Sequence, residues 1–176
     1  MGTTTVSGVL ESMEPWLAEP DGLTVDGLTV SGGEPLEQPE ALAALLRGWR
    51  EQSQASVLLF SGYEFDRCQA WLTQHPGLVD ALVAGPYRAE CGQTLALRGS
   101  DNQSLHILSA RGEEFAPYQR RVTADDLRLD VSFDVRGDAW FAGIPAPQML
   151  PQLRRLLGEC GHAAQTSDLV ETSPAC

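Results

Sequence analysis

The sequence predicts an α/β fold in which parallel strands alternate with helices. Three short strands are expected at Leu28–Ser31, Val57–Phe60 and Val79–Ala84, with helical stretches between them. This alternation is typical of parallel βα units. Val57–Phe60 is apolar at every position, as in a strand that is covered on both faces. No Pro- or Ser-rich linker divides the chain.

Three helices are expected in the first half of the chain. Apolar residues recur at helical spacing from Val6 to Leu17, and Thr5 is a candidate N-cap. The apolar faces of the next two helices are Leu42, Leu45, Leu46 and Trp49, and then Phe65, Cys68, Trp71 and Leu72.

After Gly85 the pattern changes to strands joined by longer loops. The expected elements are strands at Leu95–Arg98, Leu105–Ser109, Leu127–Val135 and Trp140–Ala142, and a last helix from about Gln148 to Leu157. We expect one domain over residues 1–158 and a flexible polar tail over 159–176.

Charge and hydropathy exclude several classes of function. The chain has a net charge of -12, with twelve Arg and no Lys. An acidic chain repels phosphate backbones and anionic lipids, so nucleic acid and membrane surfaces are poor partners. No apolar stretch approaches the ~20 residues of a membrane span, and no secretory signal is recognisable. We therefore expect a cytoplasmic protein.

The residues that commonly bind metals do not form a recognisable motif. The four cysteines, at positions 68, 91, 160 and 176, lack the short spacings of zinc or dithiol sites. The three histidines also lack ligand spacing, and structural roles are expected for them. The aspartates between Asp125 and Asp138 fit a solvated strand edge better than a calcium loop. No metal ligand is assigned.

The segment Ser31-Gly32-Gly33-Glu34-Pro35 is the most informative motif. It follows an expected strand, where α/β proteins place ligands. Two glycines allow positive φ and close approach to the main chain, while Pro35 stiffens the turn. The alternative is an ordinary β-to-α loop with two turn glycines.

Three more motifs follow in order: Ser61-Gly-Tyr63, Asp80-Ala-Leu-Val-Ala-Gly-Pro-Tyr87 and Arg98-Gly-Ser-Asp-Asn-Gln103. Together with the first motif they resemble the radical S-adenosylmethionine activating enzymes. The most similar branch comprises the activases of anaerobic ribonucleotide reductase, together with the pyruvate formate-lyase activating enzymes. The resemblance runs from about Leu23 to Leu157.

The resemblance implies a partial β/α barrel that binds S-adenosylmethionine beside a [4Fe-4S] cluster held by three cysteines. Reductive cleavage of S-adenosylmethionine then installs a glycyl radical on a partner reductase, with an electron from a separate donor. By motif, the implied cofactor-binding residues are Gly32, Gly33, Glu34, Pro35, Ser61, Gly62, Asp80, Gly143, Ile144 and Pro145. Contact with the partner's peptide is a guess for Arg98, Ser100, Asn102 and Gln103.

Two departures from the family pattern matter. The family's Cys-x-x-x-Cys-x-x-Cys motif precedes Gly-Gly-Glu-Pro, but no cysteine lies before Ser31. We expect that the first strand and the cluster loop are missing, and favour a misplaced start codon over a natural cluster-free descendant. Relatives usually also have an acidic residue where Ala84 stands.

The sequence is therefore compatible with two main functions. The first is an activase-type protein that cleaves S-adenosylmethionine to activate an anaerobic reductase. The alternative is a cluster-free, catalytically silent module that binds nucleotide or protein. A third possibility is an unstable remnant, because loss of the first strand would expose the edge of its neighbour.

Overall fold

The computed structural model describes residues 4–17, 25–133, 139–143, 149–159 and 161. The chain forms two compact units, residues 1–121 and 122–176, and each is described here by itself. No helix in the described ranges is long and apolar enough to cross a bilayer.

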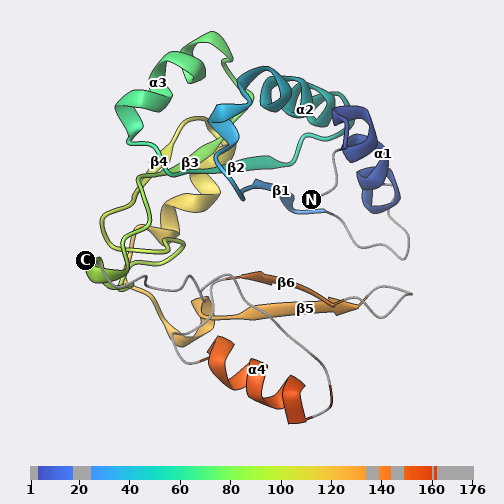
Figure 1. Cartoon of the computed structure of the whole chain (residues 1–176). Coiled ribbons are helices and arrows are strands. Elements are labelled where there is room, and N and C mark those ends of the chain that lie inside the picture. Colours follow the sequence, from blue (N-terminus) through green and yellow to red (C-terminus); the bar gives the residue numbers. More distant parts are fainter. Residues whose placement is uncertain (1–3, 18–24, 134–138, 144–148, 160, 162–176) are drawn as a thin grey trace, which may run out of the picture. The chain divides into compact units, whose positions relative to one another are not determined.

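The first unit is organised around a four-stranded sheet with the order β1-β2-β3-β4 (Figure 1). The strands are β1 (Gly27–Val30), β2 (Ser56–Ser61), β3 (Ala81–Ala84) and β4 (Ser104–Ile107). The first three are parallel, with Val30 opposite Leu59 and Ser61 opposite Ala84. β4 runs antiparallel to β3. The α/β class and the parallel βα units are confirmed, whereas closure into a partial barrel stays a prediction.

Three helices precede or connect the parallel strands: α1 (Val6–Leu17), α2 (Pro39–Gln52) and α3 (Phe65–Gln74). The expected cap of α1 is confirmed, since the backbone N–H of Gly8 donates to Thr5 Oγ1 at 3.1 Å. α2 has Pro39 at its first position, where the missing N–H has no helical partner to lose.

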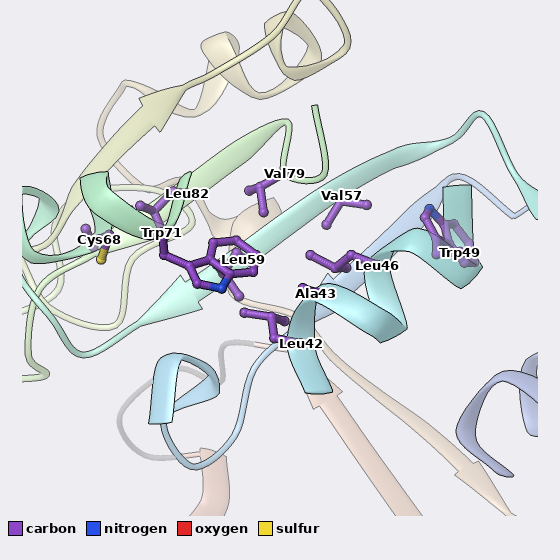
Figure 2. Close-up of a cluster of buried hydrophobic side chains, with 11 residues drawn as sticks. Leu42, Ala43, Leu46, Trp49, Val57, Leu59, Cys68, Trp71, Val79 and Leu82 are labelled. Carbon is purple, nitrogen blue, oxygen red and sulfur yellow. The ribbon is translucent and has the colours of Figure 1, made fainter. Parts of the chain in front are cut away.

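The main core lies where α2 and α3 cover one face of the sheet (Figures 1 and 2). Leu46 of α2 is fully buried and packs in one cluster with Leu59 of β2 and Leu82 of β3. Figure 2 shows Trp71 and Cys68 of α3 beside Leu59 and Leu82 in this cluster. The apolar faces predicted for these helices are therefore confirmed as core.

The opposite face of the sheet is covered by the 3₁₀ helix Arg111–Tyr118. Phe115 of this helix packs on a second cluster that contains Leu58, Val83 and Leu105. β2 therefore contributes Leu58 to one core and Leu59 to the other, which confirms that it is covered on both faces.

One expected strand is wrong. Leu95–Arg98 contains only an isolated bridge between Leu95 and Arg121, followed by a turn in which Leu97 has φ 63°. The Asp101 carboxylate accepts hydrogen bonds from the N–H groups of Thr94 and Leu95. These backbone donors are therefore not available to a strand partner.

The second unit contains an antiparallel pair, β5 (Leu129–Phe133) with β6 (Ala139–Gly143), and the helix α4 (Met149–Glu159). They agree with the expected strands and last helix in place and type, but β5 begins two residues later than expected, because Leu127 ends the 3₁₀ helix Ala124–Asp126. Residues 134–135 and 148 lie outside the described residues. The single domain over 1–158 and the polar tail over 159–176 stay predictions.

Asp80 bonds several elements at the edge of the sheet where the parallel strands begin, here called the amino edge. It is fully buried and directly precedes β3. Its carboxylate accepts from the guanidinium of Arg50, from the N–H of Val57 at 2.8 Å, from Ser109 Oγ at 2.5 Å and from Arg111 Nε at 3.2 Å. Burial alone would raise the pKa of Asp80, but the hydrogen bonds from Ser109, Arg50 and Val57 outweigh it and hold that pKa below its usual value.

Replacing Asp80 should therefore destabilise the first unit. Asp80→Asn leaves Arg50, whose side chain is only 14% exposed, without its carboxylate. We expect a loss of about 3–5 kcal/mol in the free energy of unfolding, measured by urea denaturation. The control Asp26→Asn removes an exposed carboxylate of the same unit and should change it by less than about 0.5 kcal/mol.

The stabilisation by Asp80 should be present above the ordinary Asp pKa near ~3.9 and be lost as the pH falls through the lower folded value. Wild type should therefore lose more stability in acid than Asp80→Asn. Equal stability of the two proteins at neutral pH would contradict this role.

Candidate functional site

The carboxyl edge of the sheet brings together three segments that are far apart in the sequence. Ser31–Pro35 follows β1, Ser61–Tyr63 ends β2, and Gly85–Arg88 follows β3. Because the three strands are parallel, their carboxyl ends lie along one edge. This edge is the candidate site.

The Ser31–Pro35 loop is open to solvent at its two glycines. Gly32 and Gly33 have φ of 87° and 58°, and no heavy atom lies within 4 Å of the position that a Cβ would take at either residue. In the described part of the chain, neither glycine makes a hydrogen bond through its backbone. Their carbonyl oxygens are therefore free to accept from a ligand.

Glu34 holds this loop against the end of β2. Its Oε1 accepts from Ser61 Oγ at 2.9 Å and from the N–H of Leu36 at 3.0 Å, and its Oε2 accepts from the N–H of Gly62 at 2.7 Å. Hydrogen bonds to a carboxylate are stronger than neutral ones. Pro35 follows as the first residue of a 3₁₀ helix, Pro35–Glu37, so the loop has little freedom on that side.

Ser61 supports the Ser31–Pro35 loop through its hydrogen bond to Glu34. Besides donating to Glu34, its Oγ accepts from the N–H of Tyr63 at 3.1 Å, and Cys68 Sγ lies 3.7 Å away. Ser61 is buried, so its hydroxyl bonds the loop to the interior of the protein. Gly62 offers its N–H to Glu34 in the same way.

Gly85 joins the end of β3 to this arrangement. Its N–H donates to the carbonyl oxygens of Ser61 at 3.1 Å and Tyr63 at 2.8 Å. Neither Gly85 nor Tyr63 was assigned to the site from the sequence. The signal lay in their position, since Gly85 directly follows the expected strand Val79–Ala84 and Tyr63 is the third residue after Val57–Phe60.

A cavity of about 260 Å³ lies next to the loop, between α1 and α2. It is lined by Ser31, Gly32 and Pro35 from the loop and by Thr5 and Val6 at the start of α1. The participation of α1 was not foreseen. A larger cavity of about 350 Å³ lies beside Gly27, Ser56 and Glu114, and contains none of the predicted site residues.

The residues of the Arg98–Gln103 segment point inward. Arg98 is buried, and its Nη1 donates to the carbonyl oxygens of Ala96 at 3.0 Å and Tyr118 at 3.2 Å. Burial lowers the pKa of the Arg98 guanidinium, although the nearby Asp101 opposes this. Ser100, Asn102 and Gln103 bond to the backbone of Gly85–Arg88.

Asp80 lies at the opposite edge of the sheet. It precedes the first residue of β3, about 13 Å along the strand from Ala84. Because its carboxylate is buried and bonded to Arg50 and Ser109, the assignment of Asp80 to cofactor binding is replaced by a structural role.

The last three implied cofactor-binding residues, Gly143 to Pro145, belong to the second unit. Gly143 ends β6 with φ 131° in the second unit, whereas Ile144 and Pro145 lie outside the described residues. Their assignment stays a prediction.

The two described cysteines, Cys68 and Cys91, do not supply the three thiolates that such a cluster needs. Cys68 is fully buried in the main core, and burial raises the pKa of its thiol. Cys91 lies in a separate 3₁₀ helix, Ala89–Cys91, while positions 160 and 176 are outside the described residues. Within the described ranges, no three His, Cys, Asp or Glu side chains are grouped as metal ligands.

Comparison with known proteins agrees with the sequence motifs. Two anaerobic ribonucleoside-triphosphate reductase-activating proteins, from Salmonella typhi and Salmonella typhimurium, are each 33% identical to the chain over 86 residues. The match covers 47% of this chain and 56% of each relative, so the chain spans about half the length of these relatives. No solved structure matches.

A family model described as a 4Fe-4S single cluster domain matches residues 10–106, which include the whole Ser31–Pro35 loop, Ser61–Tyr63 and the Arg98–Gln103 segment. This match covers more than half of the chain. The chain therefore belongs to the 4Fe-4S single cluster domain family and is related to the activating proteins of anaerobic ribonucleotide reductase.

Proposed function

We propose that this chain is an activase-type protein for an anaerobic ribonucleotide reductase, and that its carboxyl edge binds the methionine end of S-adenosylmethionine. The observation that carries the proposal is the attachment of the Ser31–Pro35 loop to β2 through Glu34. The proposed partner, an anaerobic ribonucleotide reductase, is taken from the names of the two relatives.

The geometry of the loop supports an ammonium as the group bound. An ammonium has three donors and no acceptor, and the carbonyl oxygens of Gly32 and Gly33 are free acceptors on exposed residues. Because Glu34 fixes the neighbouring backbone, these carbonyls are held in position before the ligand arrives. Preorganisation of this kind reduces the cost of binding.

The surroundings of the cavity suit the rest of the amino-acid moiety. The first turn of α1 lies on the cavity through Thr5 and Val6, and a helix N-terminus favours a carboxylate. Val30 and Leu42 add apolar surface to the same cavity. The ligand's methylene groups and carboxylate would thus each meet a suitable environment.

A [4Fe-4S] cluster would supply the electron for cleavage of the sulfonium, as the family resemblance implies. The described cysteines do not fit that cluster, since buried Cys68 and Cys91 come from separate elements. Cleavage, the glycyl radical, the electron donor and the partial barrel remain parts of the proposal that rest on resemblance.

The same observation on the cysteines favours a second candidate. A cluster-free module would keep the Glu34 loop and its affinity for nucleotide or for the partner protein, without carrying out the cleavage. Both functions require ligand binding at the carboxyl edge, and they differ in whether this chain assembles a cluster.

Binding of S-adenosylmethionine tests the shared part. We expect isothermal titration calorimetry to show binding by wild type, and Glu34→Ala to weaken it by about tenfold or more, because the loop loses three hydrogen bonds. The control Glu40→Ala removes an exposed carboxylate on α2 and should leave the affinity unchanged. No binding by wild type, or equal affinity for Glu34→Ala, would refute the assignment of this loop.

Anaerobic reconstitution with iron and sulfide separates the two candidates. We expect this chain to gain no stoichiometric [4Fe-4S] cluster and no visible iron–sulfur absorption, because its sequence lacks the Cys-x-x-x-Cys-x-x-Cys motif. The control is a variant in which all four cysteines are replaced by alanine, which measures adventitious iron. A stoichiometric cluster on wild type but not on this variant would favour the catalytic function. It would also contradict the conclusion that the cysteines do not fit the cluster.

A further inference from the structure

Side chains of the Arg98–Gln103 segment bond to the backbone of three of the four residues that follow β3. Gln103 Nε2 donates to the carbonyl of Gly85 at 2.9 Å, and Asn102 Nδ2 donates to the carbonyl of Pro86 at 2.7 Å. Ser100 Oγ accepts from the N–H of Arg88 at 3.0 Å. The backbone on both sides of Tyr87 is therefore fixed by side chains of one segment.

Further hydrogen bonds hold the Arg98–Gln103 segment in its own conformation. Gln103 Oε1 accepts from the N–H groups of Gly99 at 2.8 Å and Ser100 at 3.2 Å. Asp101 accepts from the N–H and hydroxyl of Thr94 at 2.6 and 2.9 Å. These polar side chains are consequently engaged in internal bonds, which argues against the guess that they contact a peptide directly.

Tyr87 is the residue that this arrangement presents. Tyr87 is 68% exposed, more than any other large hydrophobic residue in the described part of the chain. The ring lies close to Gly99, where a Cβ would come within 3.3 Å of Tyr87 Cδ2 and 3.8 Å of Tyr87 Cε2. An aromatic ring that is exposed yet held on a fixed backbone loses little conformational entropy on binding.

Tyr87 is also linked to the ligand-binding edge. The N–H of Gly85 donates to the carbonyls of Ser61 and Tyr63, and Ser61 donates to Glu34. The fixed segment Gly85–Arg88 is thus continuous with the loop that we propose for S-adenosylmethionine. A protein segment that reaches this ligand would pass along the same edge.

We infer that Tyr87 is a docking point for an extended peptide segment of the partner reductase, and that Arg98–Gln103 positions it without touching the partner. The identity of the partner rests on the proposed function. Tyrosine is one of the residues in which binding hot spots are enriched. The exposed Arg88 beside it would favour a segment that carries a carboxylate.

The test measures binding of the full-length chain to an anaerobic ribonucleotide reductase by biolayer interferometry, without oxygen and with S-adenosylmethionine present. Tyr87→Ala should weaken binding about tenfold or more, whereas Tyr87→Phe, which keeps the ring, should bind within about threefold of wild type. Tyr118→Ala, at another exposed tyrosine, is the matched control and should bind like wild type.

Gln103→Ala tests the positioning role. It should weaken binding of the reductase and speed amide exchange at Gly99 and Ser100, whose N–H groups lose their acceptor. Equal affinities for wild type and Tyr87→Ala, or no binding by wild type, would overturn the docking proposal. Calorimetry with S-adenosylmethionine on the same proteins judges the proposed function separately, because Tyr87→Ala should leave that affinity unchanged.

Discussion

The candidate site depends on one carboxylate. Glu34 binds the backbone of Leu36 on its own side and reaches Ser61 and Gly62 at the end of the neighbouring strand. Without this contact, a loop with two consecutive glycines at positive φ would have a large conformational entropy and no defined surface. The carboxylate thus gives two flexible residues a fixed position while leaving their carbonyls free.

The same bonding continues across the sheet edge. Glu34 binds Ser61, the carbonyl of Ser61 accepts from Gly85, and the carbonyl of Gly85 accepts from Gln103. Loops at three successive strand ends are therefore joined by hydrogen bonds, whereas the opposite edge is closed by buried Asp80. This division gives a stable amino edge and a carboxyl edge built from small and polar residues, as expected of a ligand-binding α/β protein.

Much of the first unit could be predicted from the sequence because its signals are local. The apolar run Val57–Phe60 and the helical spacing around Leu46 and Trp71 are sufficient to identify buried elements. The roles of Asp80 and Arg98–Gln103 could not be predicted, since a motif does not show whether a polar side chain faces a ligand or the protein. Leu95–Arg98 has the composition of a strand, but the N–H of Leu95 donates to Asp101, six residues later, and the chain turns at Leu97.

Hydrogen–deuterium exchange with and without S-adenosylmethionine tests the central claim most directly, because it reports where the ligand acts on the backbone. We predict slower exchange in peptides covering 31–37 and 61–64, because these contain the N–H groups of Leu36 and Gly62 that donate to Glu34. Exchange in the 3₁₀ helix Arg111–Tyr118 should not change. Protection confined to that helix and to Gly27–Thr29, around the larger cavity, would contradict the account.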